Sequence, residues 1–302
     1  MPDWNSLVNE VEASGSTYDA VRRKYLKELH EYTGRNVIAY YSAWLQNPNL
    51  MKQGVLGFEL NDLDKNGLMS TIYELDRSQG LDLMLHTPGG DIAATESLVE
   101  YLRSTFEDIR AVVPQLAMSA GTMIALSCRK IVMGKHSSLG PIDPQIGTTP
   151  ALGILEEWDR ALEEARKDPL RGQFWSGITN KYPPGLIGTA EKYRDWSREL
   201  AVEWMTTCMF SDLDDAAAHS KADEVLGELG SHSATKAHNR HISANRAREI
   251  GLDVVLLEDD QPLQERVLTV HHAFMLTLAS QPILKIIENH NGIAFSELYE
   301  RA

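Results

Sequence analysis

The most constraining feature of the sequence is an alternation of short apolar runs and helical patterns between residues 81 and 134. Apolar runs bounded by turn residues predict strands, here at 81–86, 109–114 and 130–134. The stretches between them carry apolar residues at helical spacing, and Asp91 stands where the N-cap of the first helix is expected. Strands that alternate with helices form layered folds with a mostly parallel sheet. We therefore predict an α/β fold.

Further elements extend this alternating region on both sides. An amphipathic stripe covers 17–32 and ends at Gly34, and a strand is predicted next, at 36–43. Beyond the alternating region, a strand is predicted at 253–258, and helices at 154–166, 191–210 and 263–289. A short tail follows the last helix. Because the sequence shows no internal repeat and no low-complexity linker, we expect one main domain with helical additions at both ends.

Two neighbouring predicted strands end in residues suited to acyl transfer. The first ends in Pro-Gly-Gly, and a glycine pair leaves backbone N–H groups unshielded, so they can approach a ligand oxygen closely. The second leads to Ser119, whose hydroxyl is expected near a helix N-terminus, where the helix dipole stabilises negative charge. Gly89 and Ser119 are thirty residues apart, which is one βα unit. This spacing places both at the same edge of a parallel sheet.

The run from Leu81 to Gln145 resembles the Clp/crotonase superfamily. Within it, the chain is most similar to the serine dehydrogenase proteinase family, which is related to the SppA-type signal peptide peptidases. The resemblance is dense over these 65 residues and continues more loosely through "NKYPPGLIG" and "HISANRAREIGLDVV". It implies a Clp/crotonase-like spiral of ββα units. The expected domains are an N-terminal helical extension (1–34), a catalytic domain (35–260) and a C-terminal helix and tail (261–302).

The resemblance also implies a serine peptidase and assigns roles to residues of the two strand ends. Ser119 would be the nucleophile, and the backbone N–H groups of Gly89 and Ala120 would form the oxyanion hole. Gly90 would keep the loop tight. His86 adjoins the Pro-Gly-Gly turn, so it is a candidate to line the site or orient the loop, although a structural hydrogen bond is the preferred interpretation.

The general base departs from the Ser-His-Asp pattern of Clp-type peptidases. When the predicted strands are matched in order to those of Clp-type peptidases, the position of their histidine falls at Ile142 or Asp143. His136 comes too early in the sequence to match it. This favours the Ser-Lys dyad of SppA-type enzymes, in which the lysine precedes a helix. Lys181, which is 62 residues beyond Ser119, is the predicted base, and Lys167 is the second choice. A lysine acts as a base only where burial or a nearby cation lowers its pKa. Asp143 is kept as a site-lining residue.

Two other interpretations stay open. The chain could be an α/β-hydrolase esterase that combines Ser119 with an acid such as Asp253 and with His271, but no motif fixes the acid or the histidine. Alternatively, it could be a crotonase-like scaffold that has lost its base and acts as a binding or assembly module. Labelling of Ser119 by a fluorophosphonate would eliminate the inert scaffold.

Composition restricts the partners and the compartment. The formal net charge of −14 provides no basic field for a nucleic acid. Two cysteines exclude a disulfide framework and suit a reducing compartment. The sequence shows no signal-peptide pattern and no apolar run long enough for a membrane span, so a cytoplasmic protein is expected. A peptide or protein substrate is the expected partner, and the family resemblance implies a homo-oligomer.

No metal or cofactor is predicted. "DLDKNG" (62–67) matches the start of a calcium-binding loop, but its twelfth position is Tyr73 instead of glutamate, so we interpret it as a helix N-terminus. No zinc-binding spacing includes the histidines, which lie at 232, 238, 241, 271 and 272. The sequence contains neither a dinucleotide-binding glycine motif nor a motif that would identify a pyridoxal phosphate lysine.

Overall fold

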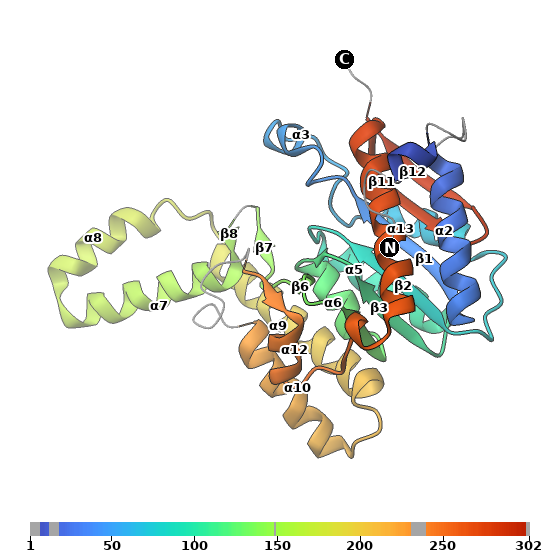
Figure 1. Ribbon diagram of the computed structural model, residues 1–302. Helices are drawn as coiled ribbons and strands as arrows, with labels where there is room; N and C mark the ends of the chain where they lie inside the picture. The colour runs from blue at the N-terminus through green and yellow to red at the C-terminus, as the bar shows by residue number, and fades with distance from the viewer. Residues whose placement is uncertain (1–6, 12–17, 148, 231–239, 300–302) are drawn as a thin grey trace.

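A seven-stranded sheet forms the centre of the computed structural model, which describes residues 7–11, 18–147, 149–230 and 240–299 (Figure 1). Five neighbouring strands are parallel: β10 (Val254–Leu256), β5 (Lys130–Met133), β3 (Ile109–Val113), β2 (Leu81–His86) and β1 (Asn36–Ser42). Beyond β1 follow the antiparallel strands β11 (Ile283–Asn289) and β12 (Ala294–Leu298). The predicted α/β class, with a mostly parallel sheet, is confirmed.

Helices cover both faces of this sheet. On one face, α2 (Tyr18–Thr33) and α13 (Gln261–Ser280) lie side by side (Figure 1). On the other lie α4 (Asp64–Ile72), α5 (Ile92–Thr105) and α6 (Ala120–Leu126). Successive side chains of a strand point to opposite faces, and β2 accordingly buries Leu83 and Leu85 in one core and Met84 in the other.

A small sheet and a second group of helices extend the core beneath α6. The small sheet has the order β4-β6-β9 and consists of β4 (Leu116–Ala117), β6 (Ser138–Leu139) and β9 (Ile242–Ser243). The helices are α9 (Leu186–Trp204), its π-helical continuation (Met205–Met209), α10 (Asp215–Leu229) and α12 (Ala244–Glu249). A 3-10 turn (Leu257–Asp259) follows β10.

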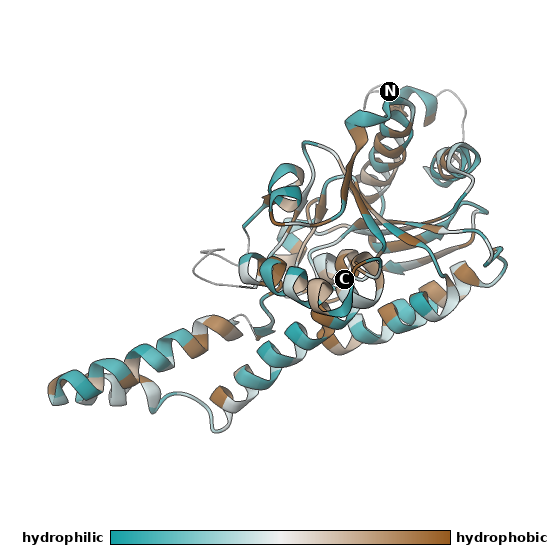
Figure 2. Ribbon diagram, turned by 90° about the horizontal axis from the view of Figure 1, so that it is seen from below, coloured by the Kyte–Doolittle hydropathy of each residue, from teal (hydrophilic) through white to brown (hydrophobic). Residues whose placement is uncertain are grey.

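An arm of two helices projects from the body of the molecule (Figure 1). It consists of α7 (Ala151–Lys167) and α8 (Pro169–Thr179), and it starts at a hairpin of β7 (Gln145–Ile146) and β8 (Thr149–Pro150). Figure 2 shows the same arm extending from the body, mostly hydrophilic along its ribbon. A small buried cluster lies where the arm starts and consists of Ala151, Ile154 and Leu155 of α7 with Ala190 of α9. A short helix, α3 (Pro48–Lys52), lies in the link between β1 and α4.

The predicted strands and helices of residues 17–134 are confirmed within a few residues, whereas the helix predicted at 263–289 is confirmed only as far as Ser280. The helix α13 ends at Ser280, and residues 283–289 form β11 in the main sheet. Pro282 cannot continue a helix, and the β-branched run that follows it favours a strand. Residues of the expected tail form β12. In the part of the chain that the structure describes, no helix is both long and apolar enough to cross a membrane.

Candidate active site

Ser119 occupies a strained turn between β4 and α6. Its φ of 49° and ψ of −115° make it the only non-glycine residue with positive φ among the described residues. Such backbone strain is found at functional sites, and a serine on a sharp strand-to-helix turn is the geometry of a nucleophile elbow. Ser119 stands at the N-cap of α6, yet its hydroxyl makes no capping hydrogen bond. The hydroxyl of this half-buried residue is therefore left for chemistry.

The Pro-Gly-Gly loop lies directly against this turn. Thr87 pairs with Ala117 in an isolated β-bridge, in which Met118 N donates to Thr87 O at 3.0 Å. Gly89 has a φ of 101°, and a Cβ on it would lie 2.7 Å from the Cβ of Ser119. Only glycine fits both this conformation and this contact. The two strand ends singled out in the sequence therefore meet at one edge of the sheet.

A third segment supports the elbow from behind. A Cβ on Gly140 would lie 3.0 Å from the backbone nitrogen of Ser119, so the chain after β6 approaches the turn closely. Thr122 ties the two together, because its Oγ1 donates to Ala117 O at 2.8 Å and accepts from Gly140 N at 2.9 Å. The small residues around Ser119 are thus required by packing.

The backbone donors near Ser119 differ in their availability. Gly89 N donates to Thr87 Oγ1 at 3.1 Å, so this expected oxyanion donor is already engaged. Across the described residues, the N–H groups of Ala120 and Gly90 have no acceptor. Ala120 is the first residue of α6, where the helix dipole favours an anion. Gly90 is exposed, whereas Gly89 is buried.

These segments surround a cavity of about 590 Å³. Ser119, Ala120 and Met123 line one wall, and the Pro-Gly-Gly loop lines another. The remaining lining comprises Met51, Glu59, Leu60, Asp91, Ile92, Ile142, Pro144, Gln145, Gly147 and Tyr193. The cavity is lined mainly by apolar side chains and has a few polar groups near the serine, as expected of a substrate site.

The structure does not bring the predicted bases to this cavity. Lys181 is exposed on the link between α8 and α9 and is not a lining residue. Its neighbour Tyr182 ties the link to the arm, because its hydroxyl donates to Glu157 Oε1 of α7 at 2.7 Å. Lys167 forms an exposed ion pair with Glu163 on α7. Neither lysine lines the cavity of its own chain.

Neither Asp143 nor His136 lines the cavity at Ser119. Asp143 is buried, and its Oδ1 accepts a hydrogen bond from Leu152 N at the start of α7 at 3.3 Å. Its neighbours in sequence, Ile142 and Pro144, line the cavity, although Asp143 itself does not. His136 is exposed and lines a second cavity.

His86 lies on the opposite face of the sheet from the serine. Its ring contacts Trp44 at a centroid distance of 4.3 Å and meets His271 edge-on at 5.3 Å. Burial, with a smaller effect of His271, lowers the pKa of His86 well below its ordinary value. His86 belongs to the core beneath α13 and not to the lining of the cavity at Ser119.

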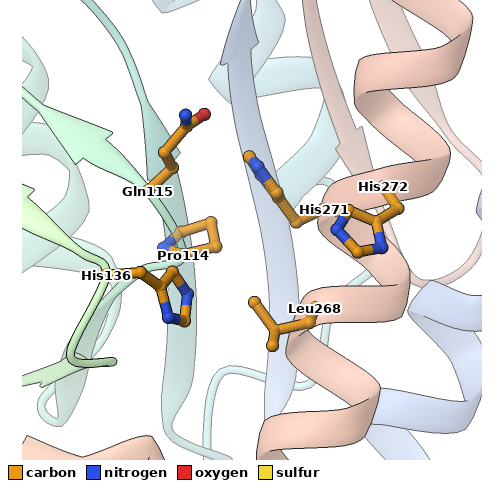
Figure 3. A pocket seen from close by; sticks show the side chains of 6 residues that line it. All are labelled: Pro114, Gln115, His136, Leu268, His271 and His272. Atoms are coloured by element: carbon orange, nitrogen blue, oxygen red, sulfur yellow. The ribbon is translucent and has the colours of Figure 1, made fainter. Parts of the chain in front are cut away.

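Figure 3 shows the second cavity, about 310 Å³ in volume, where His271 and His272 of α13 face His136 and Gln115. Burial, followed by His272 and His136, lowers the pKa of His271 to about 3. Asp253, just before β10, is exposed, and its Oδ2 lies 4.0 Å from Lys130 Nζ. The esterase triad of Ser119, Asp253 and His271 is therefore not assembled.

Within the described ranges, no group of three or more His, Cys, Asp or Glu residues is placed to hold a metal ion. His232 and His238 lie outside those ranges. Asp64 begins α4, as the prediction of a helix N-terminus at 62–67 requires, and is fully buried in an ion pair with Lys285.

Sequence reasoning missed the residues that hold the site in shape. Gly140 carries a weak turn signal in the sequence, because it forms a Gly-Pro pair with the next residue after a strand. Thr87 and Leu60 carry none, because their contacts join segments that are distant in sequence. Tyr193 of α9 lines the cavity, but in the sequence nothing distinguishes it from any other apolar residue of a helix.

Comparison with known proteins identifies the family. A family model described as ClpP-like SDH-type serine proteinase matches residues 12–170, just over half of the chain. The uncharacterized protein MJ0137 of Methanocaldococcus jannaschii is 30% identical over 220 residues, which cover 73% of this chain and 65% of that protein. MJ1495 of the same organism, also uncharacterized, is 28% identical over 234 residues, or 77% of this chain and 71% of that protein.

The chain thus spans slightly less than two thirds of the length of MJ0137. Among solved structures, a mutant of the 1510-N membrane-bound stomatin-specific protease is similar, with 16% identity and a TM-score of 0.40 over 69% of this chain and 79% of that one. The family match confirms the resemblance seen in the sequence. The chain belongs to the ClpP-like SDH-type serine proteinase family.

Proposed function

We propose that this protein is a serine peptidase whose nucleophile is Ser119. The observation that carries the proposal is the strained Ser119 turn, packed against the glycine loop at the wall of a cavity. A buried serine that served only packing would not require positive φ. Membership in a serine proteinase family supports the same assignment.

In the proposed reaction, Ser119 Oγ attacks the carbonyl carbon of a peptide bond and gives its proton to the base. The carbonyl oxygen becomes an oxyanion at the N-terminus of α6. Collapse of this intermediate breaks the C–N bond, and the base returns the proton to the leaving amine. Water then hydrolyses the acyl-enzyme by the same steps, which frees Ser119.

The proposed oxyanion hole combines Ala120 N–H with an N–H of the glycine loop. The family resemblance implies Gly89 for the second donor, but the N–H of Gly89 donates to Thr87 Oγ1 in this structure. The N–H of Gly90 has no acceptor in the described part of the chain, and Gly90 lines the cavity. We therefore assign the second donor to Gly90, with Gly89 providing the close contact with Ser119.

Lys181 remains the proposed base. Because it does not line the cavity of its own chain, it must reach a serine in another way. A lysine serves as general base only where burial or a nearby cation lowers its pKa. We propose that a second copy of the chain supplies Lys181 from the link beside its projecting arm, which would join the Ser-Lys dyad to the expected homo-oligomer. Docking of the arm would also provide the burial that the amine needs.

A fluorophosphonate probe and a fluorogenic peptide test the proposed function. The wild-type protein should be labelled at Ser119 and should cleave the peptide, and Ser119→Ala should do neither. Failure of the folded wild-type protein to react with the probe would favour the inert scaffold. Labelling accompanied by hydrolysis of aryl esters but not of peptides would favour the esterase.

A further inference from the structure

A buried ion pair lies behind the part of the cavity wall that Leu60 forms. Lys285 of β11 and Asp64 of α4 are both 0% exposed, and Lys285 Nζ lies 2.7 Å from Asp64 Oδ1. Replacing such a pair with apolar residues of similar volume is often neutral or stabilising. Stability alone therefore does not account for a lysine at this position. Tyr40 donates its hydroxyl to Asp64 Oδ2 at 2.7 Å, and Glu297 Oε2 lies 3.7 Å from Lys285 Nζ. The remaining bonds of the pair go to the backbone beside Leu60 and indicate what the pair does.

The two charges bind the two peptide groups that flank Leu60. Lys285 Nζ donates to the carbonyl oxygen of Glu59 at 2.8 Å, on the peptide group before Leu60. Asp64 Oδ2 accepts from Asn61 N at 3.0 Å, on the peptide group after Leu60. Both peptide groups are thus fixed from the side of the ion pair.

The glycine loop binds the opposite sides of the same peptide groups. Leu60 N donates to Gly89 O at 2.8 Å, and Asp91 N donates to Leu60 O at 3.0 Å. A Cβ on Gly90 would lie 2.3 Å from Leu60 N, so the two segments are in close backbone contact. Each peptide group beside Leu60 is therefore bonded to the ion pair at one end and to the loop at the other.

We propose that Lys285 and Asp64 are positioning residues of the acyl-transfer site. They hold residues 59–61, and these residues in turn hold the Gly89–Gly90 loop against Ser119. Hydrogen bonds in a chain polarise one another. A cation on the Glu59 carbonyl and a carboxylate on the Asn61 N–H therefore strengthen the two bonds to the loop. This inference rests on the proposed function, because it concerns the same site.

The test is a charge-neutral double variant, Lys285→Met/Asp64→Leu, compared with a matched pair on the other face of the sheet. Arg22 is 2% exposed and Glu288 of β11 is 0% exposed, and they form an ion pair at 2.8 Å with no bond to residues 59–61. The control is therefore Arg22→Met/Glu288→Leu. Peptide hydrolysis gives kcat and KM, fluorophosphonate labelling gives the reactivity of Ser119, and thermal unfolding shows that each variant is folded.

The expected result separates positioning from stability. Lys285→Met/Asp64→Leu should lower kcat and the labelling rate on the order of 10- to 100-fold, with KM within about twofold, because a displaced oxyanion donor acts in the transition state. The control should keep kcat within about threefold of wild type, whatever its unfolding temperature. A folded double variant with the kcat of the control, or with a change in KM alone, would overturn the inference.

A second variant keeps the test decisive if the double variant does not fold. Asn61→Pro removes the N–H that donates to Asp64 Oδ2, while both charges stay in place. The substitution should leave the backbone of Leu60 in place, because a residue before proline prefers the extended conformation that Leu60 needs for its bridge to Gly90. It should lower kcat in the same way, and wild-type kcat in this variant would refute the role. If wild-type protein itself fails to label at Ser119, the proposed function fails, which is a different result.

Discussion

The two residues proposed as the catalytic dyad lie in regions of opposite character. Ser119 is half-buried between β4 and α6, and backbone bonds and close glycine contacts fix it on three sides. Lys181 is exposed on a link beside a projecting arm, and the small buried cluster where the arm starts has four residues. One half of the dyad is rigid within a single chain, and the other half is not yet in place.

This difference separates what local geometry provides from what assembly must provide. A strand, a sharp turn and a helix N-terminus suffice to expose a serine and aim N–H groups at its reaction. Nothing comparably local brings an amine to Ser119. If a second copy supplies Lys181 from the link beside its arm, the chain is inactive until it assembles. Loss of Ser119 and loss of Lys181 should then affect activity differently.

The largest effect is expected from the rigid half. Ser119→Ala should lower kcat/KM by roughly 10⁴-fold or more, because no other nucleophile can form the acyl-enzyme. Thermal unfolding should show the variant to be folded. Peptide hydrolysis with purified protein measures the loss. Activity above about one per cent of wild type would show that another residue is the nucleophile.

The next effect tests the exposed half. Lys181→Ala should lower kcat by about 10²- to 10⁴-fold, as expected for loss of a general base. Lys167→Ala, at the end of α7 and in an exposed ion pair, is the matched control and should retain activity.

Mixing inactive Ser119→Ala with inactive Lys181→Ala tests whether the lysine is supplied by a second copy. Mixed assemblies contain sites with an intact serine on one chain and an intact lysine on the other, so part of the activity should return. If Lys181→Ala alone is fully active, the dyad is wrong. If it is inactive and mixing restores nothing, supply by a second copy is wrong.

A smaller effect tests the contact between the glycine loop and the elbow. Gly89→Ala places a Cβ at positive φ, 2.7 Å from the Ser119 Cβ, and should cost about 1–3 kcal/mol in the free energy of unfolding. It should also lower kcat by roughly 100-fold through displacement of the loop. Gly177→Ala, in α8 with open space around it, is the control and should stabilise slightly. Equal activities of the two variants would show that the loop contact does not serve catalysis.

The sequence predicts the rigid half well because its information is local. The strand runs at 81–86 and 109–114, the Asp91 cap and the turn at Ser119 are each written within a few residues. Asp91 indeed caps α5 by accepting from Ala94 N. Spacing along one βα unit then places Gly89 beside Ser119, without any knowledge of the rest of the chain.

Features that depend on distant contacts were not predictable in the same way. The strand at 283–289 resembles the end of an amphipathic helix until β1 is available to pair with it. The bond from Lys285 to Glu59 joins residues 226 positions apart, and no pattern in either segment announces it. His86 stands just before the Pro-Gly-Gly loop in sequence but points to the other face, because side chains alternate along β2.

The smallest effect concerns that other face, which neither half of the dyad touches. Burial lowers the pKa of His86 below its ordinary value of 6.5, so below pH 6.5 the unfolded chain takes up a proton that the folded chain does not. The free energy of unfolding therefore falls as pH drops below 6.5, by up to about 1.4 kcal/mol per pH unit from this residue. His271 and His290, whose pKa values burial lowers to about 3 and about 4, act in the same direction.

The variant His86→Phe should make the decline with falling pH less steep without changing the rate at which the fluorophosphonate labels Ser119 at neutral pH. Urea unfolding between pH 7.5 and 5 measures the first effect, and the remaining slope reports His271 and His290. If the slope of unfolding free energy against pH is the same in wild type and variant, His86 takes up a proton in the folded state over this pH range as well. A changed labelling rate would show that the two faces are coupled, in which case the rigidity of the serine half would depend on the packing beneath α13.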